Sequence, residues 1–132
     1  MLPTANAYSS FAAKDIGAEK HFYSEKLGLD VKDLYEGQLL ELRFGDDRRV
    51  LIYDKPDFTP ATYTVLNFPV PDVDAAVEDL TRSGVEMARF DGFEQDDKGI
   101  ARPGPEGGPT IAWFRDPAGN IIAVHSDDPP PG

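Results

Sequence analysis

Few side chains in this sequence have an ordinary pKa near neutral pH. The chain has two histidines, His21 and His125, and no cysteine. His21 falls about 140° around its predicted helix from the apolar stripe, so we expect it to face solvent. His125 lies in the last predicted strand, where an imidazole can bind a ligand or exchange protons near neutral pH. The alternative is a histidine that bonds only to backbone or water.

Other nucleophile and phosphate-binding signatures are missing. Ser9 and Ser10 are adjacent hydroxyls, but no G-x-S-x-G elbow surrounds them and no base is predicted beside them, which argues against a serine hydrolase. The chain has no G-x-G-x-x-G fingerprint and no P-loop. The lack of cysteine excludes a disulfide framework, a thiolate metal site and a cysteine nucleophile.

The charge balance restricts the partners of the chain. It has 13 Lys and Arg against 24 Asp and Glu, a formal net charge of −11. A chain this acidic is a poor ligand for nucleic acid and for anionic lipid. No apolar run approaches the roughly 20 residues of a membrane span, and the first residues lack a signal-peptide pattern, so we expect a cytoplasmic domain. The acidity either serves solubility alone or attracts a cationic small molecule.

The first half of the chain is predicted to form a strand, a helix and three more strands. Asp15 is placed to cap the helix, whose apolar face includes Ile16, Tyr23 and Leu27, and Gly28 ends it. The four predicted strands cover residues 5–13, 31–35, 38–44 and 49–54.

The second half repeats this order. Asp72 is the expected N-cap of a helix with an apolar stripe from Val73 to Leu80, and Ser83 and Gly84 close it. Strands are predicted at 63–70, 85–90, 110–114 and 121–125, with a short extended piece at 100–102. The segment 91–109 is long and polar, which is typical of a lid or a binding loop.

Asp72 follows Asp15 by 57 residues (72 − 15 = 57), and the recurring element order indicates an internal duplication. We align Phe44 with Phe114 and the strand 50–54 with 121–125. The prediction is a single α+β domain, residues 1–132, built from two βαβββ modules. Module one is 5–54, the linker is 55–61, module two is 62–126, and a frayed tail is 127–132.

Two segments resemble the vicinal-oxygen-chelate superfamily, which holds glyoxalase I, bleomycin-resistance proteins, fosfomycin-resistance enzymes and extradiol dioxygenases. Residues 15–29 resemble its helix signature, and WFRDPAGN at 113–120 resembles its C-terminal hairpin. The resemblance covers about residues 5–126. It implies two βαβββ modules whose curved sheets enclose a cleft, often in a homodimer. Pairing of the modules within one chain or across a dimer is left open.

Metal-binding members of this superfamily use up to four inward His, Glu or Gln side chains, one on the first and one on the last strand of each module. Spacing from the shared Asp and the shared turn maps these positions here to Tyr8, Ile52, Val65 and Ala123. Three of the four have no donor atom, so we expect no metal and no cofactor. This favours the metal-free, bleomycin-resistance-like branch.

If the family geometry holds, strand alternation turns a set of side chains toward the cleft. Trp113 then offers a face to a planar or cationic ligand, or else packs in the core or at a dimer contact. A buried Asn67 would orient a ligand or pair with a neighbour. Arg102 would reach over the cleft mouth or remain solvated. The predicted ligand-binding residues are Tyr8, Ser10, Ile52, Asp54, Asn67, Arg102, Trp113 and His125.

The favoured function is binding and sequestration of a small molecule by a homodimer, with no nucleic acid or membrane as partner and no catalytic residue assigned. One alternative is a glyoxalase-like lyase, isomerase or dioxygenase. Such an enzyme would use His125 and Tyr8 for proton transfer, or unusual metal ligands such as His125 with Asp54. A further alternative is an interaction or regulatory module with no small ligand.

Overall fold

The structure is a computed structural model that describes residues 1–127. The chain divides into two compact units, Met1–Pro60 and Ala61–Gly132, and the boundary falls within the segment 55–61. Each unit is described by itself. The predicted frayed tail, 127–132, lies outside the described residues apart from Asp127.

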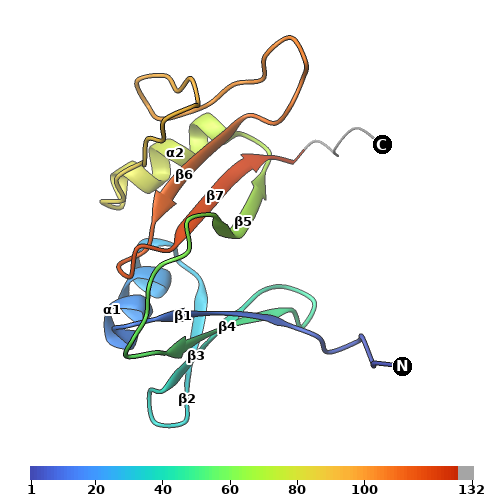
Figure 1. Cartoon of the computed structure of the whole chain (residues 1–132), viewed down its shortest axis with the longest axis vertical. Coiled ribbons are helices and arrows are strands. Elements are labelled where there is room, and N and C mark those ends of the chain that lie inside the picture. The colour runs from blue at the N-terminus through green and yellow to red at the C-terminus, as the bar shows by residue number, and fades with distance from the viewer. Residues whose placement is uncertain (128–132) are drawn as a thin grey trace. The chain divides into compact units, whose positions relative to one another are not determined.

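Unit 1 is a strand, a helix and three strands (Figure 1). Its sheet has the order β1-β4-β3-β2, in which β1 is parallel to β4 and the other pairs are antiparallel. The elements are β1 (Ser9–Ala13), α1 (Ile16–His21), a π-helical turn η1 (Phe22–Lys26), β2 (Asp30–Leu34), β3 (Leu39–Arg43) and β4 (Arg49–Asp54).

The helix of unit 1 begins and ends where the sequence predicts. The carboxylate of Asp15 accepts a hydrogen bond from the Ala18 amide at 3.1 Å, which confirms Asp15 as the N-cap. The α-helical pattern widens into the π-helical turn at Phe22. Gly28 follows with φ of 71°, a left-handed conformation that glycine adopts without a Cβ penalty.

Unit 2 has three strands and one longer helix (Figure 1). Its sheet has the order β5-β7-β6, with β5 parallel to β7 and β6 antiparallel to β7. Asp72 is the N-cap, accepting from the Ala75 amide at 3.1 Å, and Ser83 is the C-cap. The elements are β5 (Thr64–Val70), α2 (Val73–Arg82), β6 (Ile111–Arg115) and β7 (Ile121–Ser126).

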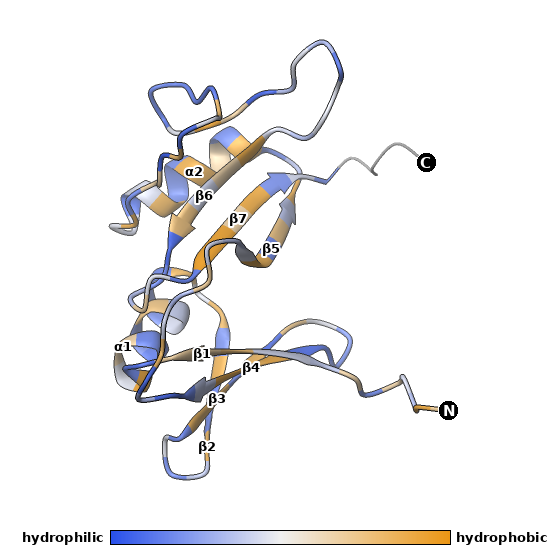
Figure 2. Ribbon diagram, viewed as in Figure 1, coloured by the Kyte–Doolittle hydropathy of each residue, from blue (hydrophilic) through white to orange (hydrophobic). Residues whose placement is uncertain are grey.

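The predicted strand at 85–90 is wrong as a regular strand, whereas the short extended piece expected at 100–102 is present. They contribute only isolated bridges, Met87 to Phe114 and Ala101 to Ile111. The side chain of Gln95 bonds the Phe90 amide and the carbonyl oxygens of Ala88 and Gly99, at 2.8–3.0 Å. The Gln95 side chain thus occupies backbone N–H and C=O groups that would otherwise be available to hydrogen-bond a neighbouring strand. Figure 2 shows the segment between α2 and β6 as mainly hydrophilic.

Each sheet has one face against its helix. In unit 1, Phe11, Ile52 and Leu40 are register neighbours, and the Phe11 ring lies 6.4 Å from that of Tyr23 in η1. We call this the helix-side face and the opposite one the distal face.

The same division holds in unit 2. Its distal face is marked by a buried cluster that includes Ala88, Ala101, Trp113 and Ala123. No residue of α2 belongs to this cluster, yet α2 contacts β6 and β7, so the helix packs on the other face, with Phe114 and Ile122. Within residues 1–127, no helix is long and apolar enough to cross a membrane.

Candidate functional site

Strand register defines which residues of the two units are equivalent. In unit 1, Leu51 lies between Ser10 and Glu41. In unit 2, Ala123 lies between Asn67 and Trp113. Leu51 is therefore the counterpart of Ala123, and Glu41 is the counterpart of Trp113.

The predicted alignment of Ile52 with Ala123 is wrong by one residue. Ile52 is fully buried and pairs in register with Phe11 on the helix-side face. Strand side chains alternate, so a shift of one residue moves a side chain to the opposite face. The predicted pairing of Phe44 with Phe114 is wrong by two residues, since the register makes Leu42 the counterpart of Phe114; this shift does not change the face.

The donor set at the family's metal positions does not fit a metal ion. On the last strands, Leu51 and Ala123 carry only hydrocarbon. On the first strands, Tyr8 precedes β1, and Val65 lies at an irregularity in the β5–β7 register. A phenol alone does not hold a divalent ion, which needs several carboxylate or imidazole ligands. In the part of the chain that the structure describes, no three His, Cys, Asp or Glu side chains form a group able to hold a metal.

Trp113 lies in an aromatic cluster on the distal face of unit 2. The side chain is 7% exposed, and its ring centroid lies 5.6 Å from that of Phe90 and 4.9 Å from that of Phe93. Phe93 itself is 56% exposed. We call Phe90, Phe93 and Trp113 the aromatic cluster. It is anchored in the core through Trp113 and reaches solvent through Phe93.

Asn67 and His125 lie on the same distal face. Asn67 is exposed, so the expected buried amide in need of a partner is not found. Its strand, β5, is an edge of the sheet. His125 is half-buried and faces the same way as Ala123, as strand alternation predicted. Its Nδ1 lies 2.7 Å from the Ser126 carbonyl oxygen, and among residues 1–127 its Nε2 has no partner.

Arg102 bonds to the helix α2. Its guanidinium donates to both carboxylate oxygens of Asp74 in α2, at 3.2 and 2.8 Å, and to Asp96 at 3.0 Å. The bonds from Arg102 lower the pKa of Asp74. The hydrogen bond from the Ile100 amide lowers the pKa of Asp96 the most, and the bond from Arg102 lowers it further. Arg102 thus ties the segment before β6 to the helix.

Of the unit 1 residues predicted as ligand-binding, Tyr8 and Ser10 lie on the distal face. Tyr8 is half exposed, and the Arg49 guanidinium lies 4.4 Å above its ring centroid. Ser10 is exposed. Ile52 is in the core under the helix, and Asp54 is exposed at the end of β4, where its amide donates to the Gln38 carbonyl.

Sequence reasoning missed a charged group on the distal face of unit 1. Glu41 is only 8% exposed and accepts hydrogen bonds from Arg43 Nε at 2.6 Å and from Arg49 Nη1 at 3.1 Å. These two bonds lower the pKa of the Glu41 carboxyl. The available signal was the alternation of Glu41 and Arg43, which puts both on one face of a strand.

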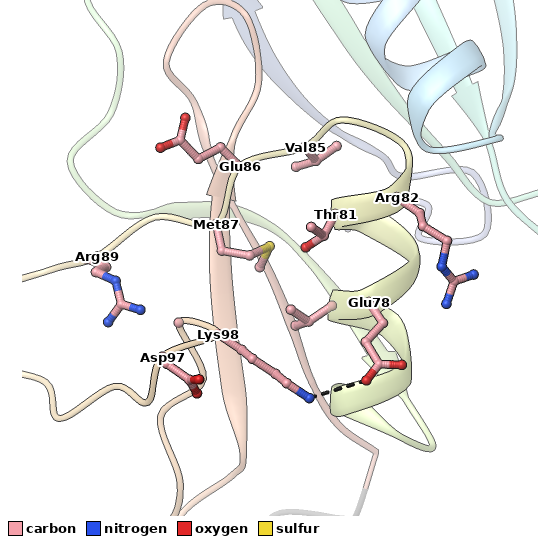
Figure 3. A pocket seen from close by; sticks show the side chains of 11 residues that line it. Glu78, Thr81, Arg82, Val85, Glu86, Met87, Arg89, Asp97 and Lys98 are labelled. Carbon is pink, nitrogen blue, oxygen red and sulfur yellow. Dashed lines mark hydrogen bonds and ion pairs between the residues drawn. The ribbon is translucent and has the colours of Figure 1, made fainter.

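Each unit also contains a cavity. In unit 2 a cavity of about 780 Å³ lies between α2 and the segment 85–99, with Val77, Val85 and Met87 as apolar lining. Figure 3 shows the Glu78–Lys98 ion pair of 3.3 Å across it. In unit 1 a cavity of about 480 Å³ is lined by Arg43, Arg48 and Arg49 among others. None of the eight predicted ligand-binding residues lines either cavity.

Residues 7–124 match the family described as the Glyoxalase/Bleomycin resistance protein/Dioxygenase superfamily. No curated protein matches this chain. Its fold is similar to that of a bleomycin-binding protein complexed with bleomycin (TM-score 0.66, 19% identity, 95% of this chain and 100% of that one). It is also similar to a lactoylglutathione lyase from Agrobacterium tumefaciens (TM-score 0.59, 23% identity, 94% of this chain and 95% of that one). An integron cassette protein from V. cholerae is similar as well (TM-score 0.63, 24% identity, 97% of this chain and 98% of that one).

Proposed function

Because the chain belongs to the glyoxalase/bleomycin resistance protein/dioxygenase superfamily, we propose that it binds and sequesters a small organic molecule without metal chemistry. The proposed binding surface is the distal face of unit 2. The observation that carries the proposal is the aromatic cluster beside Ala123, where metal-binding members of the family place an ion ligand. An aromatic wall takes the place of a metal donor.

The chemistry of this surface favours a planar or cationic ligand. Phe93 is exposed and backed by Trp113, so a flat ring can stack on it, and the face of an aromatic ring attracts positive charge. The exposed amide of Asn67 and the half-buried imidazole of His125 offer the few polar groups that orient a ligand on such a wall. The net charge of −11 raises the local concentration of a cation.

Trp113 is the only tryptophan of the chain, so its fluorescence reports directly on this surface. Titration with bleomycin and with a small planar aromatic cation is expected to give a saturable change, and an anionic glutathione conjugate is expected to give none. Phe93→Ala is expected to weaken binding at least about tenfold, the equivalent of 1.4 kcal/mol. Tyr63→Ala is the matched control, since Tyr63 is a 70% exposed aromatic outside the cluster. Absence of binding, or equal loss in the control, contradicts the proposal.

A separate measurement tests the metal-free part of the proposal. Zinc, manganese or iron(II) added to the protein is expected to leave the melting temperature unchanged, because only a ligand of the folded state stabilises it. Stoichiometric metal in the purified protein would overturn this part. The proposed binding unit is a homodimer, as the resemblance implies, and sedimentation equilibrium tests it.

His125 supports a second candidate, a metal-independent lyase or isomerase. Its Nδ1 is held by the Ser126 carbonyl oxygen and its Nε2 has no partner in the described residues, an arrangement that suits proton transfer. His125→Gln separates the two functions. In a sequestering protein it changes only the affinity, whereas in an enzyme it abolishes turnover of a compound that still binds.

A further inference from the structure

Three arginines gather at one end of the sheet of unit 1. Arg43 ends β3, Arg49 begins β4, and Arg48 lies in the turn between them. All three line the cavity of about 480 Å³, which we call the arginine cavity. Its remaining lining residues are Asp30, Glu41, Phe44 and Asp47. In a chain with a net charge of −11, such a concentration of guanidinium groups needs an explanation.

Two of these arginines are placed where their charges should lower the stability of the sheet. Arg43 and Arg49 are directly opposite each other in the antiparallel register, where like charges are destabilising. Unit 2 has no such pair, because the counterparts are Arg115 and Ile121. Glu41 bonds both guanidinium groups, and Asp30, which is in register with Arg43 on β2, adds a second negative charge beside Arg43.

The bonds to Glu41 fix the two guanidinium groups and leave donors free. Arg43 uses Nε and Arg49 uses Nη1, so Nη1 and Nη2 of Arg43, and Nε and Nη2 of Arg49, have no partner in the described residues. Arg49 is also held against the ring of Tyr8. Arg48 bonds the Gly45 carbonyl through Nε at 3.1 Å. Guanidinium groups held in this way lose little freedom when a planar or tetrahedral oxyanion binds.

We propose that the arginine cavity binds an oxyanion, the carboxylate or phosphate group of a small molecule. Asp30, Glu41 and Asp47 formally balance the three arginines, so directional N–H donors rather than net charge provide the attraction. The affinity is therefore modest and is sensitive to each acidic neighbour. The proposal rests on residues of unit 1 alone and uses no residue of the aromatic cluster.

Calorimetric titration with inorganic phosphate and, separately, with succinate identifies the group that binds. Saturable binding of one of them is expected, with shifts of the Nε–H resonances of Arg43 and Arg49 in the NMR spectrum. Arg49→Gln is expected to weaken binding at least about tenfold, while Asp47→Asn tightens it because a repelling charge is removed. Arg115→Gln is the matched control. Arg115 is the counterpart of Arg43 in unit 2 and also lies on an aromatic ring, 5.0 Å above Phe90.

Arg49→Gln also removes a bond to the buried Glu41, so Arg48→Gln provides a second test. Arg48 makes no hydrogen bond or ion pair with Glu41 in the described residues, and its replacement is expected to weaken anion binding while leaving the bonds of Glu41 intact. Absence of binding by either anion at millimolar concentration overturns the proposal. Wild-type anion affinity in both Arg49→Gln and Arg48→Gln also overturns it, as does an equal loss of anion affinity in Arg115→Gln. Phe93→Ala leaves anion binding intact, which separates this test from that of the aromatic cluster.

Discussion

The distal faces of the two units differ in chemistry at equivalent positions. In unit 1 the central residue of the face is Glu41, held between two arginines. In unit 2 the same register position is Trp113, packed between two phenylalanines. A charged surface and an aromatic surface thus occupy the same place on two copies of one motif.

The helix-side faces, by contrast, are alike. Leu42 and its counterpart Phe114 are buried, as are Ile52 and its counterpart Val124. The helix of each unit needs an apolar surface to pack against, and this requirement fixes one face of each sheet. The distal face has no such requirement, so its side chains can differ between the units. The comparison indicates that the fold is encoded on one face and ligand recognition on the other.

The largest loss of stability is expected from a substitution on the helix-side face. Phe114→Ala removes a ring that is 1% exposed and should lower the free energy of unfolding by about 3–5 kcal/mol. Urea denaturation measures this. Tyr63→Ala, at an exposed aromatic of the same unit, is the control and should change stability by less than about 0.5 kcal/mol. A loss below about 1 kcal/mol at Phe114 would contradict the assignment of this face to the core.

A smaller loss is expected on the distal face of unit 1. Glu41→Gln removes the one carboxylate that bonds both Arg43 and Arg49, and it should cost about 1 kcal/mol, since both guanidinium groups are partly exposed. The same urea experiment measures it, with the exposed Glu36 as the control for a Glu→Gln change. Stability equal to the wild type would show that the arginines do not depend on Glu41.

The smallest effect concerns pH and the contacts of Arg102. The pKa values of Asp74, Asp96 and Glu41 lie below their ordinary values of 3.8, 3.8 and 4.5. In the folded state these carboxyls hold fewer protons than in the unfolded state. Their contribution to stability is therefore present above about pH 4.5 and is lost as the pH falls through the lowered folded-state pKa values.

Melting temperatures between pH 2 and pH 7 test this expectation. The wild type should lose stability below about pH 4. Arg102→Gln should reduce that acid sensitivity because Asp74 loses its arginine donor, while Asp96 loses Arg102 but keeps the amides of Lys98 and Ile100. An identical pH profile in both proteins would show that Arg102 does not stabilise the charged carboxylates. The ion pairs of Arg102 would then not be what holds the segment 91–109 against α2.

Local signals in the sequence predicted the fold well. The caps Asp15 and Asp72 are set by contacts three residues away, and the direction of His125 follows from alternation along one strand. The strand predicted at 85–90 failed because the side chain of Gln95, outside it, bonds its backbone. Nothing in the periodicity of that segment reveals such a partner.

The site was less predictable because it depends on register between strands. The position of Ile52 was assigned by aligning the last strands of the two modules, and an error of one residue reversed its face. The group of Glu41 with Arg49 joins two strands across a turn, so only the pairing of β3 with β4 brings it together. Arg102 was placed in its loop correctly, but its partner Asp74 lies 28 residues away.

The most direct test of ligand binding at the distal face is an NMR titration of the labelled protein with a planar aromatic cation. On β6 and β7, neighbouring residues point to opposite faces, so the spectrum distinguishes the two surfaces. The account predicts shifts for the Trp113 indole and for the methyl group of Ala123, with the methyl groups of Ile122 and Val124 unchanged. Shifts confined to Ile122 and Val124, or no shifts at all, would contradict it.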